Sequence, residues 1–323
     1  MIAALALLGY AVLLATAGAG ALGRASWPRR APRLAILAWE ALSLSTIGSV
    51  LLAGVLVELA ATSDDAARRC GAPAPWPCAP ATTPAGLALA IAAAIAISAV
   101  TGRVVWCLAR TYAAAAGKRN HQLDALAVLG RPDDRLGVTL VDHAAPSAYC
   151  LPGRHGRIVV TTAALTALDE HHLAAVLAHE RAHLRQRHHL IRTTAEALSR
   201  AFPRVPAFTM AAEQIGRLSE LAADDAAAKH SGRLTVAAAL LALAEAAAPG
   251  APAPAPALTA GGTTAATRAH RLITGTRPLG RTRVLLGLAA TALVISAPAV
   301  AAAASVPAAP NTACCTTAAA QHS

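Results

Sequence analysis

Four long apolar stretches dominate the pattern of hydrophobic and polar positions along the chain. They cover residues 2–23, 34–60, 86–108 and 284–306. Each is long enough to cross a lipid bilayer as a helix, which needs roughly 20 apolar residues. The first stretch lacks the positive residues that precede the apolar part of a signal peptide, so we expect it to be retained. The pattern predicts a mainly α, polytopic membrane protein with four transmembrane helices, three of them within residues 1–110.

A more polar region, residues 111–283, lies between the third and fourth apolar stretches. Helical spacing of apolar residues predicts helices over 111–129, 170–184, 195–201, 211–229 and 234–248. Short segments rich in residues that favour β-structure predict strands at 137–141, 147–150 and 157–161. Alternating proline and alanine over 249–257 predicts an extended linker. We therefore expect an α+β domain inserted between the spans.

Positive residues predict how the chain is oriented across the membrane. The loop after the first span contains Arg24, Arg29, Arg30 and Arg33. It has no acid, whereas the loop over residues 61–85 balances two arginines with two aspartates. Lysine and arginine are enriched in cytoplasmic loops. We therefore expect the first loop and the inserted domain to be cytosolic, and the N-terminus, the 61–85 loop and the tail over residues 307–323 to be exofacial.

The composition agrees with membrane insertion and argues against nucleic acid as a partner. Of the 323 residues, 55% are hydrophobic, and the mean hydropathy is +0.49. The formal net charge is +11, but much of it lies at the cytoplasmic ends of the spans, where anionic membrane lipid attracts it. Aromatic residues make up only 3% of the chain, so it has no basic patch interleaved with aromatic side chains. We expect contact with membrane lipid and no direct nucleic-acid binding.

The cysteine positions fit this topology. Cys70 and Cys78 lie in the exofacial loop, and Cys314 and Cys315 lie in the exofacial tail. An oxidising compartment permits disulfides, so a Cys70–Cys78 bond can form there, with cross-pairing to the tail as the open alternative. The other two cysteines should stay reduced, and we interpret one of them, Cys150, as a packing residue.

The candidate chemistry lies in an H-E-x-x-H motif formed by His179, Glu180 and His183, inside a predicted helix. Two residues four positions apart differ by about 40° around a helix and about 6 Å along it, so both imidazoles can reach one metal ion. Glu180 projects beside them, where it can take a proton from a water molecule at the metal. A histidine-rich, solvated helix face can also produce this short motif by chance.

The third metal ligand has two candidates in the sequence. His189 stands where the H-E-x-x-H-x-x-G-x-x-H pattern places a third histidine, but Gln186 replaces the glycine that turns the chain in that pattern. We therefore expect the helix to run on and to carry His189 away. Glu220 and Asp224 share one face of a later helix, so Glu220 can ligate zinc while Asp224 accepts the outer N–H of a ligand histidine. An ordinary surface acid on an alanine-rich helix is the alternative for Glu220.

These motifs, taken in order, resemble those of the integral-membrane gluzincins. They are Ser147-Ala148-Tyr149-Cys150-Leu151-Pro152-Gly153, then Arg157-Ile158-Val159-Val160-Thr161, then the H-E-x-x-H helix and the E-x-x-x-D segment. The chain is most similar to the BlaR/MecR-type antirepressor metallopeptidases, with the HtpX-type membrane proteases as cousins. The resemblance covers residues 112–283. It implies a zincin-like (gluzincin) metallopeptidase domain with zinc held by His179, His183 and Glu220, Glu180 as the catalytic base, and Asp224 behind a ligand histidine.

The resemblance also implies a function. It predicts a zinc endopeptidase in a bacterial cell membrane that cleaves a protein substrate, a cytosolic transcriptional repressor of the BlaI/MecI type, in response to an envelope signal. The alternatives are an HtpX-like housekeeping protease that degrades membrane proteins and a zinc-binding membrane sensor without proteolysis. The β-lactam-sensing relatives carry a penicillin-binding domain after the last span, where this sequence has residues 307–323, so we expect no antibiotic sensing through such a domain.

Three further residues border the expected site. The resemblance places an edge strand at residues 147–150, where unpaired backbone groups can bind an extended substrate. Tyr149 in this strand is a candidate substrate-binding residue, and a half-buried strand tyrosine is the equal alternative. Arg268 and Arg271 precede the fourth span. Either can stabilise an oxyanion, but we favour contact with lipid headgroups.

Overall fold

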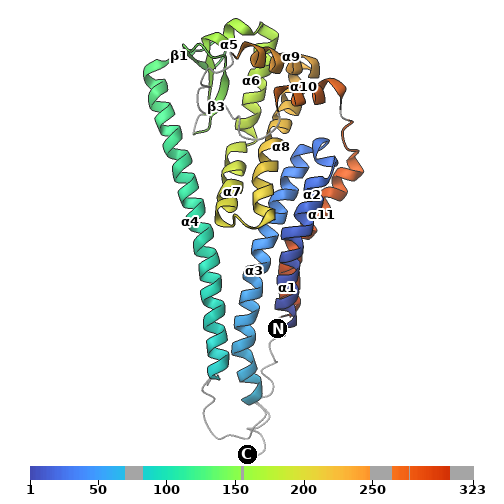
Figure 1. The fold of residues 1–323 in the computed structure, drawn as a ribbon. Coiled ribbons are helices and arrows are strands. Elements are labelled where there is room, and N and C mark those ends of the chain that lie inside the picture. Colours follow the sequence, from blue (N-terminus) through green and yellow to red (C-terminus); the bar gives the residue numbers. More distant parts are fainter. Residues whose placement is uncertain (70–82, 154–155, 248–263, 276, 306–323) are drawn as a thin grey trace, which may run out of the picture. The chain divides into compact units, whose positions relative to one another are not determined.

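The computed structural model describes residues 1–69, 83–153, 156–247, 264–275 and 277–305 (Figure 1). The chain divides into two compact units, which we describe separately. One contains described parts of Met1–Leu13, Leu44–Thr101 and Leu293–Ser323, and the other contains those of Leu14–Ser43 and Gly102–Ala292. The predicted Cys70–Cys78 disulfide, the linker over 249–257 and the tail cysteines lie outside the described residues.

Four helices among the described residues are long and apolar enough to cross a membrane. They are the continuous helix α1 (Ile2–Leu13), η1 (Leu14–Gly18) and α2 (Ala19–Arg24), then α3 (Pro32–Arg69), α4 (Pro84–Leu129) and α11 (Arg281–Ser305). In the unit that contains Met1, the hydroxyls of Tyr10 and Ser45 donate to the carbonyl of Val294, at 3.3 and 2.6 Å. These bonds satisfy polar groups that lipid would leave without partners.

Helix α4 extends far beyond its apolar part. Its 46 residues correspond to about 69 Å at 1.5 Å per residue, more than twice the roughly 30 Å of a bilayer's hydrocarbon core. The sequence predicts a span over residues 86–108 and a separate helix over 111–129, and the structure joins the two in one helix. Gly102 and Gly117 do not interrupt it, since an isolated glycine in a helix costs only about 1 kcal/mol.

A four-stranded sheet follows α4, in the strand order β1-β2-β4-β3. Its strands are β1 (Gly130–Asp133), β2 (Val138–Val141), β3 (Ala148–Leu151) and β4 (Arg157–Thr161). β2 runs parallel to β4, whereas β3 pairs antiparallel with β4 and lies at the edge of the sheet. β1 was not predicted because Gly130 and Pro132 usually interrupt a strand, and here they lie in an edge strand, where proline is tolerated. The edge position of β3 leaves one side of its backbone without a strand partner among the described residues.

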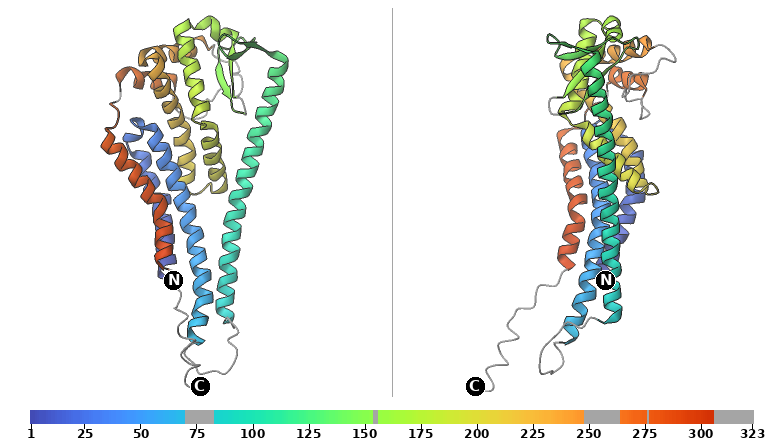
Figure 2. Two further views of the ribbon diagram at one scale, coloured as in Figure 1. Left: turned by 180° about the vertical axis from the view of Figure 1, so that it is seen from behind. Right: turned by 90° about the vertical axis from the view of Figure 1, so that its left-hand side faces the viewer.

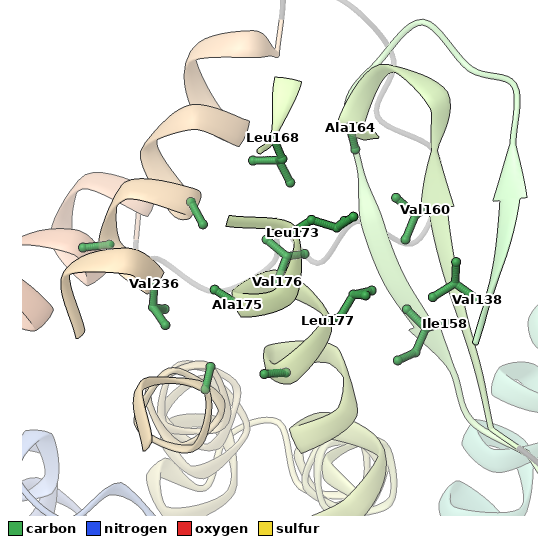
Figure 3. Close-up of a cluster of buried hydrophobic side chains, with 14 of the residues drawn as sticks. Val138, Ile158, Val160, Ala164, Leu168, Leu173, Ala175, Val176, Leu177 and Val236 are labelled. Carbon is green, nitrogen blue, oxygen red and sulfur yellow. The ribbon is translucent and has the colours of Figure 1, made fainter. Parts of the chain in front are cut away.

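One face of the sheet packs on helix α6 (Glu170–Arg185) to form the core of this unit (Figure 3). Val138, Ile158 and Val160 of the strands belong to the same buried cluster as Leu173 and Leu177 of the helix. Side chains alternate between the faces of a strand and recur every three or four positions along a helix. The contact between sheet and helix therefore buries the apolar face of each, and it fixes the orientation of α6.

The remaining helices of this unit pack on α6, on α8 or on α9. They are η2 (Trp27–Arg29), α5 (Thr162–Ala167), α7 (His188–Ala201), α8 (Pro206–Ser231), α9 (Arg233–Ala246) and α10 (Ala265–Thr274). Helices α7 and α8 lie side by side (Figures 1 and 2). α6 and α8 meet through small residues, with Ala182 against Ala223 and Ala226. Gly232 separates α8 from α9 with a φ of 83°, a conformation that glycine adopts readily.

The prediction that α6 runs on past Gln186 is wrong. α6 ends at Arg185, and Arg187 adopts the left-handed conformation with a φ of 50° before α7 begins. This conformation costs a residue with a side chain roughly 1–2 kcal/mol, so the surrounding contacts must stabilise the turn. After the turn, α7 continues beyond the end of α6 and packs against α8 (Figure 1), and its first turn brings His188, rather than His189, to the H-E-x-x-H motif.

Candidate metal centre

The two motif histidines lie on the buried side of α6. The Asp169 side chain caps the start of this helix by accepting a hydrogen bond from the His172 N–H at 2.8 Å. His179 and His183 are 8% and 7% exposed, and their Nε2 atoms lie 3.1 Å apart. The four-residue spacing therefore directs two potential ligand nitrogens toward one point.

Glu220 on α8 completes a triangle with these nitrogens. Its Oε2 lies 3.6 Å from Nε2 of His179, and its Oε1 lies 3.7 Å from Nε2 of His183. Ligand atoms placed tetrahedrally at 2.0–2.1 Å from zinc are about 3.3 Å from one another. The three side chains therefore fit zinc, and they leave a fourth position open. With its side chain 15% exposed, Glu220 is not an ordinary surface acid.

The charge states around this triangle also suit a cation. Burial raises the pKa of the Glu220 carboxyl, but His179, His183 and Arg268 outweigh burial and hold that pKa well below its ordinary value. Burial, followed by the neighbouring His179, lowers the pKa of His183 to about 3. Glu220 is therefore ionised and His183 neutral, as metal binding requires. Against burial, Asp224 and Glu220 raise the pKa of His179 to about 10, so binding of zinc there releases a proton.

Asp224 lies behind His179 and is fully buried. Its Oδ1 is 3.1 Å from Nδ1 of His179, on the opposite side of the ring from the triangle. It also accepts hydrogen bonds from Nε and Nη2 of Arg268, at 2.9 and 2.6 Å. A carboxylate in this position fixes the tautomer and the orientation of a ligand histidine. Burial raises the Asp224 pKa, but Arg268 and His179 outweigh it and bring the pKa to about 2.

Asp224→Ala is expected to destabilise the folded protein strongly. It leaves the Arg268 guanidinium buried without its main partner, and the removal of one member of a buried ion pair typically costs about 3–5 kcal/mol. The measurement is the midpoint of thermal unfolding in detergent, with Glu213→Ala as the control. Glu213 lies on the same helix but its side chain is 55% exposed, so its loss should shift the midpoint little. Equal midpoints for the two variants would contradict this role of Asp224.

The structure differs from the interpretation of Arg268 and Arg271 as contacts to lipid headgroups. Arg268 on α10 lies against Asp224 and also places Nη1 3.2 Å from Oε2 of Glu220. Arg271 pairs with Asp225 through two hydrogen bonds of 2.9 Å and donates to the carbonyl of Arg29. Both guanidiniums are mostly buried, with side chains 13% and 8% exposed. They attach α10 to α8 behind the candidate ligands.

His188 is a site residue that the sequence analysis did not identify. Its Nδ1 lies 2.9 Å from Nδ1 of His183, and the residue is 2% exposed. His183 thereby has a partner for its outer nitrogen, as His179 has in Asp224. Burial lowers the pKa of His188 to about 4, which keeps its ring neutral. Only the clustering of histidines after the motif hinted at this residue.

His188→Ala is expected to weaken zinc binding by about 10–100-fold, the usual effect of removing the outer partner of a ligand histidine. His189→Ala is the matched control, because it removes the adjacent ring, whereas the ring that contacts His183 is that of His188. Competition with a calibrated zinc chelator measures both affinities. If the two variants bind zinc equally well, His188 does not orient His183.

Glu180 lies beside the triangle and next to Cys150 of strand β3. Burial raises the pKa of the Glu180 carboxyl, with a further contribution from Glu220. Burial and the hydrogen-bonded Glu180 raise the pKa of the Cys150 thiol well above its ordinary value. A thiol held protonated is a poor nucleophile, so Cys150 fits the expected packing role, and it also borders the candidate base. Cys107 and Cys150 are both free thiols.

A cavity of about 1190 Å³ reaches the triangle. Its walls include the candidate ligands and Glu180, the edge strand β3, and parts of α4 and α7. Tyr149 of β3 lines this cavity and also packs on the cluster of Leu126, Leu151 and Val159. Its position therefore agrees with both readings of this tyrosine, as a substrate contact and as a half-buried strand residue.

Comparison with known proteins identifies the family of this domain. Residues 117–285, just over half of the chain, match peptidase family M48. No curated protein and no solved structure matches the chain. The match covers the edge strand, the H-E-x-x-H helix, Glu220, and the two arginines, Arg268 and Arg271, that attach α10 to α8. Family M48 consists of membrane-associated, typically zinc-dependent metallopeptidases, which agrees with the four apolar helices and with the possible metal site. The chain belongs to peptidase family M48.

Proposed function

We propose that this chain is a membrane-embedded zinc endopeptidase whose active site faces the cytosol. The observation that carries the proposal is the triangle of His179, His183 and Glu220 in a cavity that is also lined by the edge strand β3. A peptide that adds to this edge as a further strand passes next to the open fourth position and to Glu180. Backbone hydrogen bonds to β3 hold such a peptide largely independently of its sequence, as in other strand-addition complexes.

Zinc, when bound, polarises the scissile carbonyl and lowers the pKa of water toward 7. The residues of the chain supply the remaining steps. Glu180 accepts the proton of the attacking water and donates it to the departing amine, a role that suits a carboxyl whose pKa is raised by burial. Asp224 and His188 hold the outer nitrogens of His179 and His183, so both ligand rings keep one orientation through the cycle.

We further propose a regulatory role, with a cytosolic transcriptional repressor of the BlaI/MecI type as substrate and an envelope signal as trigger. The support is the resemblance of the motifs to BlaR/MecR-type antirepressor peptidases, together with the predicted cytosolic side of the domain. This step is an analogy between sites on related folds, so it needs a test that identifies the substrate without assuming it.

The test compares newly formed protein N-termini in cells that produce the wild type, Glu180→Gln or the control Glu213→Gln at matched levels. Termini that appear with the wild type and the control, but not with Glu180→Gln, identify the substrates. A repressor fragment among them supports regulation, whereas many fragments of membrane proteins support the HtpX-like alternative. Identical profiles for all three proteins under several envelope stresses would favour a zinc-binding sensor without proteolysis.

A further inference from the structure

Helix α4 forms one wall of the cavity that reaches the metal site. At one end of this wall, the Tyr112 hydroxyl is 3.2 Å from the Leu190 carbonyl and 2.8 Å from the Thr194 hydroxyl, both on α7. At the other end, Leu126 belongs to the cluster that covers the sheet next to β3. The stretch between these two contacts lines the cavity, and the ribbon of α4 stands apart from α6 and α7 there (Figure 1).

Two positive side chains lie in the middle of this stretch. Lys118 and Arg119 line the cavity, and no acidic side chain among the described residues pairs with either of them. The other arginines of the cavity lining each have an acidic partner. Arg192 lies 3.3 Å from a Glu220 oxygen, and Arg268 lies 2.6 Å from an Asp224 oxygen. Of the other two acids in the lining, Glu180 is the candidate base at the metal site, and Glu196 is bound at 2.6 Å to Arg200, which is not a lining residue.

Helix α7, which forms the opposite wall, contributes neutral histidines and a paired arginine to the described part of the cavity lining. His188, His189 and Arg192 line the cavity from this side. The pKa of His189 is lowered by burial and then by the nearby charges of Arg119 and Arg187, so the positive potential extends across the cavity to α7. A negatively charged group that enters here meets uncompensated positive charge from α4 and no free acid from α7.

Lipid headgroups do not account for these charges. Lys118 lies eight residues beyond Arg110, where the apolar part of α4 has ended, which places it about 12 Å further along the helix axis. The same wall becomes apolar toward the sheet, where Ala125, Leu126 and Leu129 line the cavity. Lys118 and Leu129 are about 16 Å apart along the helix, which corresponds to roughly five residues of an extended peptide.

We propose that the cavity selects an acidic substrate segment, with aspartate or glutamate held by Lys118 and Arg119 about five residues from an apolar side chain held near Leu129. This inference rests on the proposed peptidase function and specifies its substrate class. In this proposal α4 determines which substrate side chains are accepted, because α4 supplies both the basic and the apolar contacts, while β3 binds the peptide backbone.

Binding of fluorescent peptides to the zinc-loaded Glu180→Gln protein in a non-ionic detergent tests this proposal without requiring cleavage. The peptides share a leucine and differ in the pair five residues away, which is Glu-Glu, Gln-Gln or Lys-Lys. We expect the Glu-Glu peptide to bind at least about tenfold more tightly than the Lys-Lys peptide at low salt, and the difference to shrink at high salt. Glutamates introduced by Lys118→Glu and Arg119→Glu should reverse the preference.

The matched control is Arg131→Glu with Arg135→Glu, which makes the same change in net charge at exposed positions outside the cavity lining. It should leave the peptide preference unchanged. Equal affinities for the Glu-Glu and Lys-Lys peptides would overturn the proposal. So would a Lys118→Glu, Arg119→Glu variant that keeps its peptide preference and loses only its association with anionic lipid vesicles. Failure of the peptidase function itself has a different signature, in which acidic peptides are bound selectively but the wild type cuts none of them.

Discussion

Glu180→Gln is expected to lower kcat for peptide cleavage by about 10²–10⁴-fold, the range that proton transfer by a positioned carboxyl contributes. The amide has nearly the shape of the carboxylate but cannot accept and return a proton. Because Glu180 lies beside the triangle and is not one of its three members, the variant should keep its zinc. Metal analysis and peptide cleavage on the same purified sample measure both properties.

The control for this prediction is Glu213→Gln, which makes the same chemical change on an exposed part of α8. It should cleave peptides at the wild-type rate. A Glu180→Gln protein that binds zinc and retains wild-type kcat would show that another group acts as the base. A variant that has lost its zinc would instead place Glu180 among the ligands, which the triangle geometry does not predict.

Glu220→Ala is expected to remove zinc from the purified protein and to abolish cleavage with it. The substitution leaves only two ligand side chains, so the loss of affinity should exceed the 10–100-fold that removal of an outer partner causes. It also leaves Arg192 and Arg268 without the carboxylate that lies within 3.3 Å of both. Zinc content per chain, measured after dialysis against a weak chelator, should fall from about one to near zero.

Two controls separate ligand loss from misfolding. Glu213→Ala, on the same helix, should keep its zinc. Glu220→His restores a ligand atom of a kind that zinc accepts and should recover part of the affinity. Normal zinc content in Glu220→Ala would mean that another residue is the third ligand, and the gluzincin assignment of Glu220 would then be wrong.

The local part of this site can be predicted from sequence because helix geometry determines it. His179 with His183, and Glu220 with Asp224, each share a face through four-residue spacing. The strong apolar patterns of α6 and the long helices are also local, and the structure contains a helix over each of them, although α3 and α4 extend well past the predicted ends at residues 60 and 108. Alanines at the contact between α6 and α8 then let the two helices approach closely enough for Glu220 to reach both histidines.

The remaining features depend on residues that are distant in sequence or on an unusual backbone conformation. Nothing in the local sequence indicates the left-handed conformation of Arg187, which ends α6 and directs His188 toward His183. Arg268 lies 44 positions after Asp224 and beyond the predicted linker. Its contact with Asp224 arises from the docking of α10 on α8, which periodicity within either helix does not reveal.

The continuity of α4 is a further feature that the sequence pattern does not predict, because the pattern indicates two separate helices. The apolar segment over residues 86–108 and the mixed segment over 111–129 have different periodicities, because one is expected in lipid and the other borders the cavity. This difference in environment suggests two separate helices, but the backbone forms one helix through both segments. In the proposed function, one continuous helix contains both a membrane span and the substrate wall next to the metal site.

The central claim, a zinc-dependent peptidase site built on His179, His183 and Glu220, is tested most directly by metal removal and return on one purified sample. Cleavage of a proteome-derived peptide library is measured as purified, after complete chelation, and after one equivalent of zinc is restored. We predict cleavage before chelation, none after it, and recovery with zinc in the wild type but not in Glu220→Ala. Cleavage that persists in the fully chelated protein, or that zinc restores equally in Glu220→Ala, would contradict the claim.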